Sequence, residues 1–325
     1  MSDILALAAD NLLSPIILCF ALGLFAALAR SDLTVPEAVA RGLSLYLLFA
    51  IGFKGGASVA SHGIDLTLGL SLLAGLILSL ALPFAAYALL RALTALNPTD
   101  AAATAAHYGS ISIVTFVAAT SVLESQGLAA EGYMVAVAAV MEAPAILSAL
   151  WLAARGTGGA KMDGTLWREI LLNGSIVLLI GSFAIGWATG TDGLKEIESF
   201  IVSPFKGVLC LFLLDMGLVA GRGLRQSRGA LDPGVIAFGL IMPPLASVAG
   251  LAGALLLGLS PGGTALMMAL AASASYIAVP AAMRVALPEA NPSVYLTLSL
   301  GVTFPFNLTL GIPLYIAAAN WATGA

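Results

Sequence analysis

Long apolar runs separated by short polar segments dominate the pattern of this chain. A helix needs about 20 apolar residues to cross the roughly 30 Å hydrocarbon layer of a membrane. We expect membrane-spanning helices at residues 14–30, 38–60, 66–93, 100–121, 130–153, 168–189, 199–222, 234–258, 263–284 and 292–319. Helices are predicted rather than a barrel, because each backbone N–H and C=O in lipid must be paired within its own run.

The composition agrees with a membrane setting. Apolar residues make up 60% of the chain and charged residues only 9%, whereas a soluble domain carries roughly 25% charged residues. Membrane lipid is therefore the expected surrounding. The net charge of −4 is too small to indicate a nucleic-acid partner. Cys19 and Cys210 lie inside apolar runs, so we expect neither a disulfide nor a transition-metal site.

The basic residues fall unevenly on the two sides of the predicted membrane. Of the 13 Lys and Arg residues, all but Lys54, Lys195 and Lys206 lie on one side when the spans alternate. Basic residues collect in cytoplasmic loops. This distribution predicts that both termini are periplasmic or extracellular and that the polar, Gly-rich segment at the midpoint is cytoplasmic.

The chain also matches itself at an offset of about 163 to 165 residues. FALGL from Phe20 aligns with FAIGW from Phe183, and GSISIVTFVAA from Gly109 aligns with ASASYIAVPAA from Ala272. A near-constant offset over separate segments predicts an internal duplication. The predicted units are a first repeat at residues 1–153, a cytoplasmic linker at 154–167 and a second repeat at 168–325.

A third match aligns RGLSLYLLFAIGFKGG with KGVLCLFLLDMGLVAG, which pairs Gly52 with Gly217 and Gly56 with Gly221. Each half holds five spans, an odd number, so the second half enters the membrane from the opposite side. We predict an all-α integral membrane protein with ten transmembrane helices in two inverted five-helix repeats. This plan is typical of secondary transporters.

The spans at 100–121 and 263–284 are unusually polar, and interrupted helices near the membrane midplane form the binding sites of such transporters. Residues two apart point about 200° away from each other on an intact helix. The duplicated Ser-x-Ser can therefore line one cavity only if both helices are unwound there. Pro280 is expected to free backbone carbonyls for a cation. The predicted substrate-binding residues are Gly109, Ser110, Ser112, Thr115, Ser273, Ala274, Ser275 and Tyr276.

The alternative for these hydroxyls is a bond to the carbonyl one turn earlier, or close helix packing. Glu142 and Asp215 lie inside spans, where a charge costs several kcal/mol and marks a functional candidate. Each contacts the coupling ion or else pairs with Lys54 or a neighbouring helix. His107 is a proton acceptor or a packing residue, and Arg284 is expected to extend to the cytoplasmic interface.

Asn307 lines the cavity or caps a broken turn. The predicted ion-binding residues are Ser112, Thr115, Ser275, Glu142, Asp215 and Asn307, with Na⁺ as the coupling ion. The sequence contains no HExxH, GxSxG, Walker A or GxGxxG motif, so neither an enzyme nor an ATP-driven pump is predicted. We expect no catalytic residue and no cofactor, and we interpret the chain as an ion-coupled carrier.

Several blocks resemble the sodium-dependent bicarbonate transporter family of cyanobacteria along essentially the whole chain. The blocks are VPEA from Val35, FKGG from Phe53, the segment from Asp100 to Glu124, ASASYIAVPAAMR from Ala272, ANPSVYL from Ala290 and GIPLYI from Gly311. The resemblance implies a homotrimeric permease of the bacterial cytoplasmic membrane that imports bicarbonate with Na⁺. It also implies that the two polar spans cross at the site, and that a P-II-like regulatory protein is a partner.

The chain departs from that family inside the expected site. Family members carry Ser-Gly-Ser-Thr at residues 112–115 and Ser-Ser-Ser-Asp-Ile-Ser-Gly-Pro at residues 273–280. This chain has Val114 in place of a serine and Tyr276 in place of the acidic residue, and its cytoplasmic loop is shorter. A small organic anion is therefore an alternative substrate. A channel or receptor that does not cycle is the alternative from another class.

Overall fold

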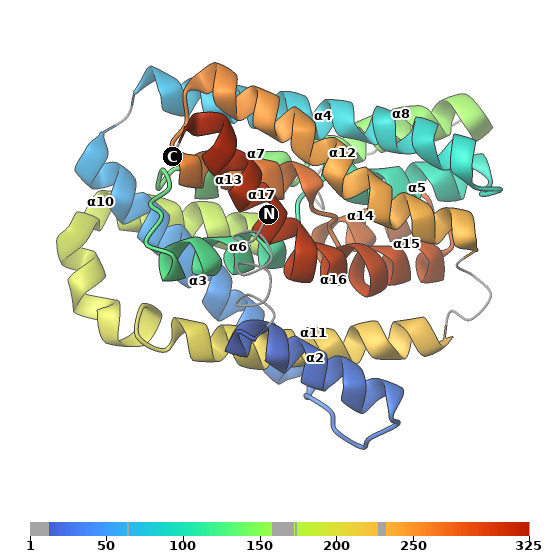
Figure 1. Cartoon of the computed structure of the whole chain (residues 1–325), viewed down its shortest axis with the longest axis horizontal. Coiled ribbons are helices and arrows are strands. Elements are labelled where there is room, and N and C mark those ends of the chain that lie inside the picture. Colours follow the sequence, from blue (N-terminus) through green and yellow to red (C-terminus); the bar gives the residue numbers. More distant parts are fainter. Residues whose placement is uncertain (1–12, 64, 158–171, 173, 227–231, 325) are drawn as a thin grey trace.

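The computed structural model describes residues 13–63, 65–157, 172, 174–226 and 232–324. These residues fold into helices joined by short connections (Figure 1). The α-helices are α2 (Pro15–Leu28), α3 (Glu37–His62), α4 (Leu66–Leu93), α5 (Pro98–Gly109), α6 (Ile113–Ser125), α7 (Met134–Met141), α8 (Pro144–Thr157), α10 (Gly174–Ile201), α11 (Phe205–Gln226), α12 (Pro233–Leu257), α13 (Pro261–Ala272), α14 (Ala278–Ala286), α15 (Pro292–Leu298), α16 (Phe304–Phe306) and α17 (Ile312–Thr323). Two π-helical stretches, η1 (Ser299–Thr303) and η2 (Asn307–Gly311), flank α16.

Among the described residues, 8 helical stretches are long and apolar enough to cross a membrane. The predicted spans at 14–30 and 263–284 correspond instead to the short helix α2 and to the interrupted pair α13 and α14. The predicted linker overlaps the end of α8, and its residues 158–167 lie outside the described part of the chain. The chain is thus an all-helical, multi-pass membrane protein in the part that is described.

Apolar side chains cover much of the outer surface. Leu256 is 89% exposed and Trp321 is 85% exposed. Water would make such exposure unfavourable by about 25 cal/mol for each Å² of apolar surface, whereas lipid does not. The surface therefore fits a bilayer, as the composition predicts.

The helices form two packed groups. The first group, which we call the panel, consists of α2, α3, α10 and α11, with α2 against α11 and α3 against α10. The second group, which we call the core, holds α4 to α8 and α12 to α17, with α4 against α5 and α12, and α13 against α12 and α17. In Figure 1 the panel runs along the left and lower edges of the molecule, with the core above it.

Glycines bring the panel helices into backbone contact. A Cβ atom on Gly23 of α2 would lie 2.0 Å from the carbonyl oxygen of Leu214 on α11. In return, a Cβ on Gly217 of α11 would lie 2.1 Å from the carbonyl oxygen of Phe20. Only glycine fits at such distances, so α2 and α11 depend on both residues to pack.

The same arrangement recurs between α10 and α3. A Cβ on Gly186 would lie 2.1 Å from the carbonyl oxygen of Phe53, and a Cβ on Gly56 would lie 1.9 Å from that of Phe183. Phe183 and Gly186 are the residues that the sequence aligns with those of α2. The two helix pairs of the panel are therefore packed alike.

The packing corrects the alignment of the second helices by one turn. The sequence match pairs Gly52 with Gly217, whereas the contacts make Gly56 the counterpart of Gly217. The shift is four residues, about one turn of 3.6 residues, so both alignments place glycine on the same face. A repeated glycine face cannot by itself distinguish one turn from the next.

Glycine packing in the panel leads to a first prediction. Gly186→Val forces a side chain against the backbone of α3, and overpacking of this kind costs about 1–3 kcal/mol. We expect a lower midpoint of thermal unfolding and a lower yield of monodisperse protein in detergent. Gly181→Val on the same helix is the matched control, because a Cβ there would meet nothing within 4 Å. Equal midpoints for the two variants would contradict the proposed close packing.

Candidate functional site: the crossover of two broken helices

The first break lies between α5 and α6. Helix α5 ends at Gly109, and the next residue, Ser110, has an extended backbone with φ −85° and ψ 161°. Ser112 is also extended and caps α6, where its Oγ accepts a hydrogen bond from the Thr115 N–H at 3.2 Å. The unwinding that the Ser-x-Ser spacing requires is confirmed here.

The second break lies between α13 and α14. Helix α13 ends at Ala272, Ser273 is extended with φ −83° and ψ 158°, and α14 begins at Ala278. The predicted unwinding is confirmed here too, but the predicted role of Pro280 is wrong. Pro280 is in the first turn of α14, where backbone N–H groups have no helical partner and proline is tolerated.

Backbone groups of each break are paired by the other break. The Ser112 N–H donates to Ser273 Oγ at 2.9 Å. The Ser275 N–H donates to the His107 carbonyl oxygen at 2.8 Å, and His107 Nδ1 contacts the Ser275 carbonyl oxygen. All four residues are buried. The two broken spans therefore cross in direct contact, and we call these residues the crossover.

His107 is held tightly at this crossing. Its ring stacks on Tyr295 with 4.6 Å between the ring centres. The side chain is fully buried, and Nε2 has no hydrogen-bond partner among the described residues. The contacts fit the packing alternative for His107, while Nε2 remains free for a ligand.

The Asn307 side chain caps the C-terminal end of α13. Its Nδ2 donates to the Ala272 carbonyl oxygen at 2.8 Å, and its Oδ1 accepts from the Tyr315 hydroxyl at 2.8 Å. Asn307 starts the π-helical stretch η2. Of the two alternatives for this residue, the structure shows the cap of a broken turn.

Glu142 marks a third interruption, between α7 and α8. The helix stops at Met141 and resumes at Pro144, because proline lacks the N–H that would continue it. The Ser110 hydroxyl donates to the Glu142 carbonyl oxygen at 2.9 Å. The Glu142 residue is itself buried. The structure thus brings the backbone of Glu142 to the first break.

Asp215 lies elsewhere. It is buried in α11 of the panel, and the ion pairs of the described residues do not include it. The alternative that Asp215 or Glu142 pairs with Lys54 is wrong, because Lys54 Nζ lies 2.7 Å from Glu124 Oε1. Sequence reasoning missed this ion pair, which joins residues 70 positions apart.

Three predicted site residues remain: Thr115, Gly109 and Ala274. The Thr115 hydroxyl is buried without a hydrogen-bond partner among the described residues, which makes it available to a ligand. A Cβ on Gly109 would lie 2.3 Å from Pro83 Cγ, so Gly109 is needed for the packing of α5 on α4. Ala274 is buried within the second break.

Tyr276 occupies the position of the acidic residue in the resembling cyanobacterial family. Its ring begins a row of aromatic side chains, Tyr276, Phe304 and Phe20, which we call the aromatic wall. The Tyr276 ring packs edge-on against Phe304 at 5.5 Å, and Phe304 packs edge-on against Phe20 at 5.4 Å. Phe20 belongs to α2, so this row of rings links the crossover to the panel. The site is less polar on this side than a carboxylate would make it.

A family model for the Na⁺-dependent bicarbonate transporter superfamily matches residues 15–320. The chain belongs to this superfamily. The match runs from α2 into α17 and includes the whole crossover. The superfamily is one of transporters, which agrees with the expectation that the chain is not an enzyme. A direct comparison with curated protein sequences finds no match.

The name of the superfamily specifies Na⁺-dependent transport of bicarbonate. Within the described residues, no group of three or more His, Cys, Asp or Glu side chains could hold a metal ion. A Na⁺ site would not need such a group of side chains, because Na⁺ also binds hydroxyl and carbonyl oxygens, and the residues of the crossover carry both.

The Asn307 contacts lead to a second prediction. Asn307→Ala leaves the Ala272 carbonyl and the Tyr315 hydroxyl unpaired, and each buried unpaired group costs about 1–3 kcal/mol. We expect a lower unfolding midpoint, measured by tryptophan fluorescence in detergent. Asn320→Ala is the control, because Asn320 Oδ1 has no partner among the described residues. If Asn307→Ala behaved as the control does, its bonds would not support the broken helix.

Proposed function

We propose that the chain is a Na⁺-coupled secondary transporter that imports bicarbonate by alternating access, and that the crossover holds both substrate and ion. Membership of the superfamily supports the substrate and the ion. The single observation that carries the choice of site is the meeting of four helix ends: the ends of α5 and α13 and the starts of α6 and α14.

The helix starts favour an anion. A helix N-terminus has about half a positive charge and free N–H groups, which together bind anions. Bicarbonate also has a hydroxyl that donates a hydrogen bond. The Thr115 hydroxyl and His107 Nε2 are buried and unpartnered among the described residues, so they fit a ligand that both donates and accepts. The remaining substrate-binding residues are those of the two extended segments, 109–112 and 273–276.

The helix ends favour Na⁺. Carbonyl oxygens at a helix C-terminus have about half a negative charge, and the hydroxyls of Ser112, Thr115 and Ser275 add neutral oxygens. Glu142, whose backbone carbonyl is bonded to Ser110 of the first break, would supply full charge if its carboxylate turned to the ion. Asn307 and Asp215 join the ion site only after rearrangement, because Asn307 is bonded to Ala272 and Tyr315 and Asp215 lies in the panel.

We extend the proposal to inverted repeats at residues 1–153 and 168–325, and to ten membrane crossings. Helices α5 and α13 both contain 12 residues, with N-caps at Asn97 and Ser260. These caps are 163 residues apart, which is the offset of the duplicated sequence. The reciprocal glycine contacts of α2 with α11 and of α10 with α3 support the same symmetry.

The aromatic wall favours a second substrate. Tyr276 of the second break packs its ring against Phe304, and Val114 is buried in α6. A small organic anion, such as a monocarboxylate, would bury its alkyl group there, as bicarbonate cannot. Competition between acetate or pyruvate and bicarbonate during uptake separates the two substrates.

Assembly and location follow the family resemblance. We propose a homotrimer in the bacterial cytoplasmic membrane, with both termini outside. A P-II-like protein is the proposed partner on the cytoplasmic side. Mass measurement of the protein in lipid nanodiscs tests the trimer, and protease access to tags at each terminus tests the orientation.

The proposed coupling makes a third prediction. Proteoliposomes should accumulate radiolabelled bicarbonate against its gradient when Na⁺ is outside and should fail to do so when K⁺ replaces it. Accumulation excludes a channel, which can only equilibrate its substrate. Uptake that is indifferent to the cation would overturn Na⁺ coupling, and equilibration without accumulation would leave the channel alternative.

The paired hydroxyls make a fourth prediction. Ser112→Ala and Ser275→Ala should each lower the uptake rate at least tenfold, because one lost hydrogen bond to a charged ligand is worth about 1.5–3 kcal/mol. Both variants should still elute as monodisperse protein in size-exclusion chromatography, although Ser112→Ala also loses the N-cap of α6, which costs about 0.5–2 kcal/mol. Ser247→Ala is the matched control, because that buried hydroxyl bonds only to Pro244 in its own helix. Wild-type rates in both site variants would limit these serines to packing.

A further inference from the structure

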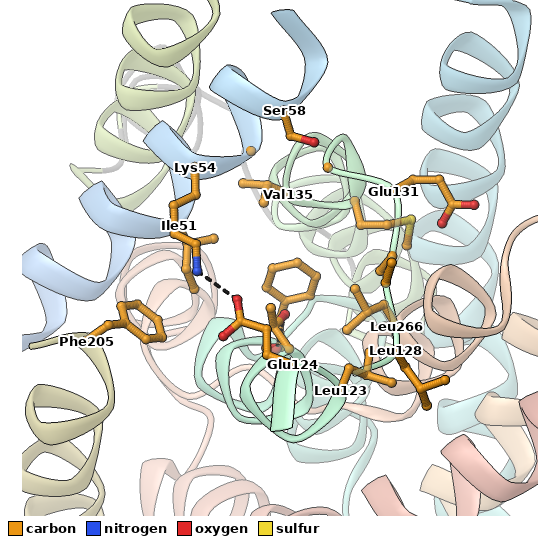
Figure 2. A pocket seen from close by; sticks show the side chains of 17 residues that line it. Ile51, Lys54, Ser58, Leu123, Glu124, Leu128, Glu131, Val135, Phe205 and Leu266 are labelled. Atoms are coloured by element: carbon orange, nitrogen blue, oxygen red, sulfur yellow. Dashed lines mark hydrogen bonds and ion pairs between the residues drawn. The ribbon is translucent and has the colours of Figure 1, made fainter. Parts of the chain in front are cut away.

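A cavity of about 280 Å³ lies between the panel and the core (Figure 2). Its walls come from α3, from α6, from the segment that leads into α7, and from the starts of α11 and α13. Phe116 and Thr120 of α6 line it, and α6 begins at the crossover. The cavity therefore follows α6 from the crossover side towards the far end of this helix, at Glu124.

The Lys54 and Glu124 side chains point towards each other in this cavity, as Figure 2 shows. Lys54 belongs to α3 of the panel, and Glu124 is in the last turn of α6 in the core. Their 2.7 Å ion pair thus joins the two groups of helices. Lys54 Nζ also lies 5.2 Å from the centre of the Phe205 ring, a further attraction for the cation.

The ion pair is on the side of the membrane that the distribution of basic residues assigns to the exterior. The side chains of Lys54 and Glu124 are 27% and 40% exposed. Pairs this accessible contribute little to stability. Such a pair joins the panel and the core without locking them together.

The other half of the chain holds a counterpart with opposite charge. The Phe53 carbonyl oxygen packs against Gly186, and the Leu214 carbonyl oxygen packs against Gly23 in the same way. Lys54 directly follows Phe53, as Asp215 directly follows Leu214. The packing therefore makes Asp215 the equivalent of Lys54, although the sequence match pairs Asp215 with Ala50.

The core has a residue of opposite charge for each of Lys54 and Asp215. Glu124 is in the last turn of α6, and Arg284 is in the last turn of α14, the helix that follows the second break. The ion pairs among the described residues are Arg41 with Glu37, Lys195 with Asp192, and Lys54 with Glu124. Within the described part of the chain, Asp215 and Arg284 thus form no ion pair, while their counterparts are joined.

We propose that Lys54 with Glu124 and Asp215 with Arg284 are two charge-reversed gates that close alternately at the outer and inner ends of the pathway. The structure then shows the outer gate closed and the inner gate open. The proposal rests on the alternating access proposed above. It gives Asp215 a role in gating in place of the predicted role in binding Na⁺.

Labelling of a single cysteine tests both gates with one measurement. Thr120→Cys places a thiol in the outer cavity, after the two free cysteines are removed by Cys19→Ser and Cys210→Ser. The rate at which a membrane-impermeant methanethiosulfonate labels this thiol from outside reports how often the outer gate opens. Transport is not needed for this readout, so failure of the proposed substrate leaves the test intact.

Loss of the outer gate should speed labelling. Lys54→Gln and Glu124→Gln are each expected to raise the labelling rate about two- to fivefold, the effect of one exposed ion pair. The exchanged double variant, Lys54→Glu with Glu124→Lys, should return the rate towards the original value. Lys195→Gln is the control, because Lys195 forms an ion pair of the same kind with Asp192 away from the cavity. Rates that all match the parent protein would overturn the outer gate.

Loss of the inner gate should slow the same labelling. Asp215→Asn and Arg284→Gln remove the pair that favours the outward-open state, so each should lower the rate, and the double variant should be no slower than either one. Additive effects, or no change in both single variants, would overturn the pairing. An altered half-saturation for Na⁺ in Asp215→Asn, with unchanged labelling, would assign Asp215 to the ion site instead.

Discussion

The pairing of two helix breaks inside the membrane is the constraint on which this fold depends. An unpaired N–H or C=O in hydrocarbon costs several kcal/mol, and the breaks at residues 110–112 and 273–277 release several such groups. The protein pairs them across the break: Ser112 N–H with Ser273 Oγ, and Ser275 N–H with the His107 carbonyl. Neither broken helix is stable at this depth without the other. The crossing that makes a polar site is thus also what makes the interrupted helices possible.

This constraint explains why the core and the panel are built differently. Helices α5, α6 and α13 must be surrounded by protein, and almost every residue in them is buried. Small side chains such as Ala102 and Ala106 let other helices enclose them. The panel packs through glycines, with backbone against backbone, and its helix α10 is kinked at Gly190. Close packing of this kind joins the helices within each pair, while apolar side chains of the pairs pack against the core in one shared cluster.

Much of this arrangement follows from the sequence, because it is dictated by length or by local geometry. Apolar runs locate the helices, and the Ser-x-Ser spacing requires an unwound segment because an intact helix separates the two side chains. The sequence does not determine the register between Gly52 and Gly56, since both lie on one helix face a single turn apart. It also does not reveal that Asn307 caps α13, or that Lys54 pairs with Glu124. Those contacts join distant segments and depend on how the helices cross.

The balance of energies also indicates which part of the molecule moves. Separating the crossover would expose at least two backbone groups in the membrane interior, at several kcal/mol each. Sliding the panel along the core breaks one half-exposed ion pair, worth about 1 kcal/mol or less, and shifts the apolar side chains that the two groups share, such as Phe20 and Phe304. For the proposed transport cycle, the movement with the smaller cost is the favoured one. In the alternating access proposed above, we therefore expect the crossover to move as one unit, with access changing sides at the surface between panel and core.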